Sequence, residues 1–93
     1  MGNPRPRPEH LSEKLRQIRS ALGLSQTQML SRLGLEDMKP GRISQYENNE
    51  REPTLQTLLA YSRAAGIYME DIVDDDLDLP AKIPGNVRRR SKR

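Results

Sequence analysis

The 93-residue chain contains no cysteine, no tryptophan and no phenylalanine, and three tyrosines are its only large aromatic residues. Without cysteine, neither a disulfide framework nor a thiolate metal site is available. With 33% hydrophobic residues, the core must be small and mostly aliphatic, and a chain of this length holds one domain. The composition therefore indicates a single small domain.

Other absences exclude whole classes of function. No apolar stretch approaches the roughly 18 residues needed to cross a bilayer, and the N-terminus lacks the apolar run of a signal peptide. The single histidine, His10, has no catalytic or metal-binding partners in view, and no glycine-rich phosphate loop is present. The acids from Asp74 to Asp78 lack the glycine and spacing of a calcium loop. We therefore expect no enzyme, no metal, no cofactor and no membrane association, and a cytoplasmic location.

The net charge of +3 hides a segregation of charge along the chain. Residues 9–80 hold 8 Lys or Arg and 13 Asp or Glu, a net charge of −5. The other eight basic residues lie near the two ends and are Arg5, Arg7, Lys82, Arg88, Arg89, Arg90, Lys92 and Arg93. Such runs are either solvated tails or electrostatic arms that bind phosphates without reading sequence. Both readings stay open.

Apolar residues recur at helical spacing in the first third of the chain. The first stretch predicts a helix at about residues 10–22, which Gly23 ends in a left-handed conformation. Ser25 is expected to cap a second helix of about eight residues, which Gly34 ends. A polar connection, residues 35–39, follows.

A third helix is predicted from Pro40, which suits the first helical turn, to about Asn48. Ile43 and Tyr46 point inward from it, and Asn49 turns the chain in a left-handed conformation.

Two more helices complete an all-α domain of five short helices. Thr54 is expected to cap the fourth helix, whose inward stripe we take to be Leu55, Leu58, Leu59 and Ser62, and Gly66 ends it. The fifth helix contains Ile67, Met69, Ile72 and Val73. After it, Leu77, Leu79 and Pro80 are expected to pack back as an extended strap. We predict a disordered Pro/Arg arm at residues 1–8, the domain at residues 9–80 and a disordered basic tail at residues 81–93.

The segment LSQTQMLSRLG, residues 24–34, followed by ISQYEN, residues 43–48, resembles the phage-repressor and Cro family of helix-turn-helix proteins, the Xre type. The similarity continues upstream over residues 15–23 and downstream over residues 51–66. It covers residues 9–73 in all. The resemblance implies a lambda-repressor-like fold and double-stranded DNA as the partner, in a bacterial or phage regulator.

The resemblance also implies which residues touch DNA bases. Family members read base edges from the start and the outward face of the third helix. The matching positions are Lys39, Gly41, Arg42, Ser44 and Gln45. Arg42 suits a bidentate contact to guanine and Gln45 one to adenine, whereas Gly41 lets the backbone approach closely.

Further positions match phosphate contacts of the family. Gln26 falls at the start of the second helix, where free N–H groups and the helix dipole favour an anion. Asn48, Asn49 and Arg51 follow the third helix, in a loop that contacts the sugar–phosphate chain. The alternative for all of these residues is simple solvent exposure.

The family resemblance implies one structural ion pair and a core. Arg19 and Glu47 match an arginine and a glutamate that fix the third helix on its support. The core positions are Leu15, Ile18, Leu33, Ile43, Leu58 and Leu59. Two departures stand out, because the family usually has a small residue where this chain has Leu30, and the connection at residues 35–39 is about three residues longer.

These features predict a sequence-specific, repressor-like transcriptional regulator that binds an inverted repeat as a homodimer and associates with the nucleoid. Dimerisation is expected through the fifth helix and the strap. The alternative is an antitoxin or adaptor in which the same fold mainly binds a partner protein. A third reading is non-specific nucleic-acid binding through the basic tail alone.

Overall fold

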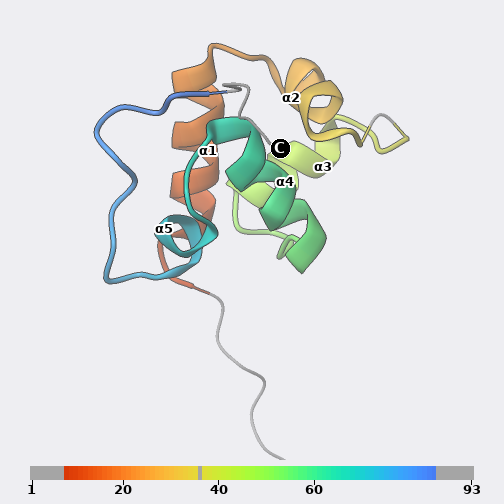
Figure 1. Ribbon diagram of the computed structural model, residues 1–93. Coiled ribbons are helices and arrows are strands. Elements are labelled where there is room, and N and C mark those ends of the chain that lie inside the picture. Colours follow the sequence, from red (N-terminus) through yellow and green to blue (C-terminus); the bar gives the residue numbers. More distant parts are fainter. Residues whose placement is uncertain (1–7, 36, 86–93) are drawn as a thin grey trace, which may run out of the picture.

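The computed structural model describes residues 8–35 and 37–85, and over these residues the chain is all-helical with no strand. Five short helices surround one core (Figure 1). They are α1 (Leu11–Leu22), α2 (Gln26–Leu33), α3 (Gly41–Glu47), α4 (Leu55–Ala65) and α5 (Met69–Val73). The predicted fold class is confirmed, and no described helix is long and apolar enough to span a membrane.

The helix ends follow local sequence signals. Glycines at positions 23, 34 and 66 end α1, α2 and α4 with φ values of 70°, 76° and 72°, the left-handed region that costs glycine little. Ser25 caps α2 in a capping box, in which its hydroxyl accepts from the N–H of Gln28 and its own N–H donates to the Gln28 side chain. Thr54 caps α4 by accepting from the N–H of Thr57. Each of these signals depends only on residues close together in the sequence.

The core forms where α1 packs against α3, α4 and α5, and α2 packs against α3 and α4. Its fully buried side chains include Leu15, Ile18, Met29, Ile43, Tyr61 and Ile72. Tyr61 supplies the largest of them and was not expected in the core.

The expected stripe of α4 is wrong at two positions. Leu55 is 72% exposed and Leu59 is 38% exposed, whereas Leu58 and Ser62 are buried as expected. The buried stripe continues through Tyr61 rather than through Leu59. Because successive helical residues are rotated by about 100°, Leu59 points well away from the Leu58 face.

The connection between α2 and α3 is less polar than predicted. Leu35 and Met38 are partly buried and pack against the core, so these residues add apolar contacts to the body. Pro40 precedes α3 instead of occupying its first turn, and its φ of −56° already suits a helix. Asn49 after α3 has the expected positive φ, 62°.

The chain after α5 returns along α1 as an extended strap, residues 77–85 (Figure 1). Leu79 and Ile83 pack against the core. The strap continues past residue 80, since the N–H of Gly85 donates to the carbonyl of Ala65 over 2.8 Å. A Cβ on Gly66 would lie 2.6 Å from the Gly85 carbonyl, so this docking needs glycine at position 66. Residues 81–85, which were expected to begin the tail, thus belong to the strap. The rest of the expected tail, residues 86–93, and residues 1–7 of the expected arm lie outside the described residues.

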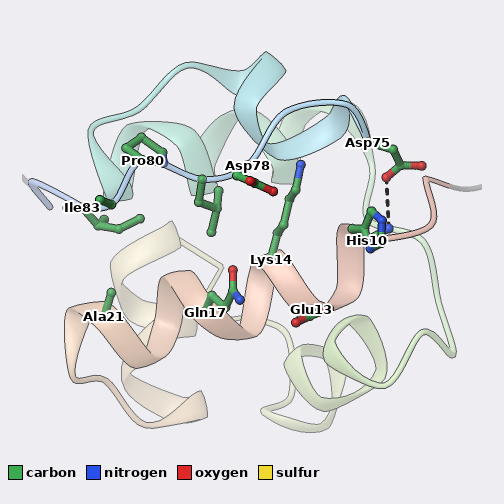
Figure 2. A pocket seen from close by; sticks show the side chains of 11 residues that line it. His10, Glu13, Lys14, Gln17, Ala21, Asp75, Asp78, Pro80 and Ile83 are labelled. Atoms are coloured by element: carbon green, nitrogen blue, oxygen red, sulfur yellow. Dashed lines mark hydrogen bonds between the residues drawn. The ribbon is translucent and has the colours of Figure 1, made fainter.

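Two charged side chains tie α1 to α5 and the strap (Figure 2). Lys14, only 4% exposed, donates from Nζ to the carbonyls of Asp71, Asp74 and Leu77 over 2.6–2.9 Å. Asp75 accepts from the N–H groups of Glu9 and His10 at the start of α1, over 2.7 and 3.0 Å. These two backbone hydrogen bonds hold the pKa of the Asp75 carboxyl below its usual value.

Candidate nucleic-acid interface

Helix α3 presents one face to the core and the other to solvent. Ile43, Tyr46 and Glu47 are buried, with Ile43 fully inaccessible. Ser44 and Gln45 lie between Ile43 and Tyr46, Arg42 precedes Ile43, and all three are partly exposed. The outward face thus consists of side chains that hydrogen-bond well to base edges.

The start of α3 is open. Lys39 and Gly41 are exposed, and a Cβ built on Gly41 would meet no atom within 4 Å. Gly41 has no positive φ that would require glycine. Neither its backbone angle nor its neighbours explain why this position carries no side chain, whereas close approach of another molecule to the backbone would explain it.

The structure brings Arg19 and Glu47 together across the contact of α1 with α3. Arg19 Nε lies 2.6 Å and Nη2 lies 3.0 Å from the two oxygens of the Glu47 carboxylate. Arg19 Nη1 also donates to the carbonyl of Leu24 over 3.0 Å. The hydrogen bond with Glu47 raises the pKa of Arg19. Such a bidentate pair restricts the orientation of α3 on α1.

Two further hydrogen bonds organise the outward face. Arg51 Nε donates to Oε1 of Gln45 over 3.1 Å, and Asn48 Nδ2 donates to Oγ of Ser44 over 3.1 Å. The loop after α3 therefore holds two of the expected reading side chains. Neither link was predicted. The i,i+4 spacing of Ser44 and Asn48 could have signalled the second, whereas Gln45 and Arg51 meet only after the chain turns.

Arg42 extends from α3 toward the preceding connection, where Nη1 lies 3.9 Å from Sδ of Met38. A thioether is a weak acceptor, so this contact leaves the donors of the guanidinium available to a stronger acceptor.

Gln26 is the first residue of α2. Ser25 takes up the N–H of Gln28 with its hydroxyl and that of Met29 with its carbonyl. The N–H groups of Gln26 and Thr27 have no acceptor in the described part of the chain, which leaves donors for an anion at this helix end. The pattern S-x-x-Q from Ser25 to Gln28 signals the capping box, of which only the Ser25 cap was predicted.

Behind the Arg19–Glu47 pair lies Tyr61. Its hydroxyl is buried and finds no hydrogen-bond partner among the described residues. Burial, and secondarily the charge of Glu47, raise the pKa of Tyr61 above its usual range. Neither this tyrosine nor the buried Lys14 was predicted from the sequence. The signal for Lys14 was its spacing, three residues after Leu11 and four before Ile18, which places it on the apolar stripe of the first helix.

The described residues include no group of three or more histidine, aspartate or glutamate side chains placed to hold a metal ion.

Comparison with protein families matches residues 15–72 to the helix-turn-helix family. Comparisons with curated proteins and with solved structures gave no match. The family is DNA-binding and regulatory rather than enzymatic, and its match spans all of the predicted reading and phosphate-contacting positions. The chain belongs to the helix-turn-helix family of the phage-repressor (Xre) type and is a DNA-binding regulator.

Proposed function

We propose that the protein reads a specific double-stranded DNA sequence with α3, as a homodimer on an inverted repeat, and acts as a repressor-like transcriptional regulator. The observation that carries this proposal is the outward face of α3. Arg42, Ser44 and Gln45 stand on that face, while Ile43 and Tyr46 anchor the helix from behind. A helix held in this way can enter the major groove with its reading side chains forward.

Phosphate contacts on both sides of α3 would set its register in the groove. On one side is the open N-terminus of α2 at Gln26. On the other side are Asn48, Asn49 and Arg51, in the turn that follows α3. Contacts of this kind position a protein on the duplex and leave sequence readout to the base edges.

The test is selection from a random duplex library with the full chain at physiological salt. We expect a short palindromic consensus, and we expect the double variant Arg42→Ala with Gln45→Ala to lose it. The matched control is Gln56→Ala with Arg63→Ala, which removes the same two side-chain types from exposed positions on α4. A consensus that survives in the first variant, or disappears in the control, would contradict the assignment of α3.

Dimerisation needs a surface away from α3. The strap is a poor candidate because Leu79 and Ile83 already pack against the core. Tyr68 directly precedes α5 and is 77% exposed. We therefore place the dimer contact at the N-terminal end of α5, around Tyr68. Sedimentation equilibrium of the native chain should give a dimer that Tyr68→Ser weakens, and a consensus of two half-sites spaced by about 34–36 Å would agree with it.

The alternative of an antitoxin or adaptor draws support from the acidic region after α5. Asp74, Asp75, Asp76 and Asp78 are all exposed, and this surface would repel DNA. Recovery of one stoichiometric partner protein, together with duplex binding at background level, would favour this function over DNA reading. Binding that depends wholly on the basic tail would instead show no consensus and a steep loss with salt.

A further inference from the structure

A groove of about 570 Å³ runs between α1 and the strap (Figure 2). Its α1 wall is a helical stripe of residues one turn apart, namely His10, Glu13, Gln17 and Ala21. Its other wall is formed by the strap and by Asp75, and the side chain of Lys14 crosses between the walls. The groove has no part in the α3 interface.

The two ends of the groove differ in chemistry. One end carries three exposed carboxylates, those of Glu13, Asp75 and Asp78. Glu13 and Asp78 make no ion pair within the described part of the chain. The other end is apolar and is lined by Ala21, Leu79, Pro80 and Ile83. A ligand that matches both ends combines cationic groups with compact apolar ones.

We propose that this groove is the docking site of the chain's own N-terminal arm, residues 1–7. The arm reads MGNPRPR and alternates proline with arginine from position 4 to position 7. Proline rings pack against apolar side chains in peptide-binding grooves, and guanidinium groups form strong charge-assisted hydrogen bonds with carboxylates. The arm thus combines the two chemistries that the groove offers.

The point at which the arm joins the domain lies at the acidic end of the groove. Asp75, a groove residue, holds the N–H groups of Glu9 and His10, the residues that follow Pro8 and lead into α1. Docking from this anchor is intramolecular, so weak contacts suffice. Seven residues of polyproline helix span about 22 Å, at about 3.1 Å per residue. The twelve residues of α1 span about 18 Å, and the arm therefore reaches the apolar end.

The basic tail fits the groove less well. It follows Gly85, which docks beside Ala65 at the apolar end, and residues 86–93 contain no proline. The tail could therefore bring its charges to the acidic end of the groove, but it has no proline to pack against the apolar end.

Docking of the arm would place Arg5 and Arg7 on the side of α1 that carries the strap. In Figures 1 and 2, α3 lies on the other side of α1. Docking of the arm requires no DNA, and it does not depend on the function proposed for α3.

Paramagnetic relaxation in the full chain tests this proposal without DNA. The chain has no cysteine, so Gly2→Cys accepts one nitroxide label at the arm. We expect the amides of Gln17, Ala21 and Ile83 to lose most of their NMR intensity relative to the reduced label. Raising the salt concentration should restore part of it, because exposed ion pairs are screened.

Two charge variants with the same label separate docking from chance encounters. Glu13→Gln with Asp78→Asn removes the two groove carboxylates that form no ion pair with any described residue, and should restore the intensities. The matched control, Asp37→Asn with Glu50→Gln, removes two exposed acids near α3 and should leave the broadening unchanged.

Three results would overturn the proposal. The first is broadening that is absent or spread evenly over the surface. The second is groove broadening from a label at Ser91→Cys but not from Gly2→Cys, which would assign the groove to the tail. The third is broadening between separately labelled molecules in a mixed sample, which would assign it to a second copy.

Discussion

At the scale of single residues, the α3 region separates positions that stabilise the domain from positions that are left open. Glu47 is buried and paired with Arg19, whereas Gly41 is exposed and a Cβ built on it would meet no atom within 4 Å. A residue without a side chain, in a helix that could accept one, costs stability. The cost makes sense if another backbone or a phosphate approaches there.

The variant Gly41→Ala tests this reading directly. We expect the free energy of unfolding to stay constant or rise by less than about 1 kcal/mol, because alanine favours a helix over glycine. Affinity for the selected duplex should fall, because the new methyl group stands where DNA approaches. Urea denaturation and duplex titration measure the two effects separately. Unchanged affinity would mean that the backbone at Gly41 does not contact DNA closely.

Tyr61 is a second residue whose chemistry only the folded chain reveals. Its buried hydroxyl has no partner among the described residues, and removing an unsatisfied group can be neutral or stabilising. Tyr61→Phe should therefore leave the free energy of unfolding unchanged or raise it by about 1 kcal/mol. Denaturation at neutral pH measures this effect, and a clear loss of stability would indicate a hydrogen bond to water.

Tyr61 also makes the free energy of unfolding depend on pH in the alkaline range. Burial raises the pKa of Tyr61 above the ordinary value of 10.0, so the folded chain favours the neutral phenol. This contribution to stability is complete below pH 10 and is lost as the pH rises above it. The loss amounts to about 1.4 kcal/mol for each pH unit. Unfolding curves at several alkaline pH values should show a shallower decline for Tyr61→Phe than for the native chain.

At the scale of helices, α1 and α5 hold each other's ends. Helix α5 has only five residues, too few to be stable alone. The ammonium of Lys14 on α1 donates hydrogen bonds to the carbonyls of Asp71 and Asp74 toward the C-terminal end of α5. A positive charge there also interacts favourably with the negative end of the helix dipole. In return, Asp75 just after α5 accepts two N–H groups at the start of α1.

Lys14→Met keeps the apolar stem and removes the charged group. We expect it to lower the free energy of unfolding by about 3 kcal/mol, because three carbonyls lose their donor in a part-buried site. The control Arg16→Met alters a nearby exposed cation on α1 and should change stability by less than about 0.5 kcal/mol. Thermal or urea denaturation compares the two variants. Equal effects would show that the Lys14 hydrogen bonds add little.

At the scale of the whole molecule, charge is divided between the domain and the ends of the chain. Residues 9–80 carry a net charge of −5, while residues 88–93 carry five of the basic side chains. A negative body gains little from long-range attraction to DNA, whereas basic ends supply it without regard to sequence. Specificity and non-specific affinity would then belong to different parts of one chain.

Replacing Arg88, Arg89 and Arg90 together by glutamine tests this division. The plot of log affinity against log salt concentration should become shallower, by up to about 3 if each arginine neutralises one phosphate. The selected consensus should not change, because α3 is intact. Duplex titrations at several salt concentrations give the slope. An unchanged slope would place the tail away from DNA.

The sequence by itself determined the features that depend on neighbours along the chain. Helix ends follow from glycines such as Gly23 and from caps such as Ser25, because these signals act through hydrogen bonds within one turn. The family pattern of residues 15–72 likewise carries the fold class and the pairing of Arg19 with Glu47. Each of these features can be read without knowing how distant segments meet.

The tertiary structure decided the features that depend on which segments pack together. Hydrophobicity alone favoured Leu59 for the core, but the face of α4 that packs against α1, α2 and α5 contains Tyr61 and leaves Leu59 exposed. Lys14 lies in a buried position because carbonyls about 60 residues away accept three hydrogen bonds from its Nζ. A buried charge is stable only beside such partners, and only the folded chain shows where those partners are.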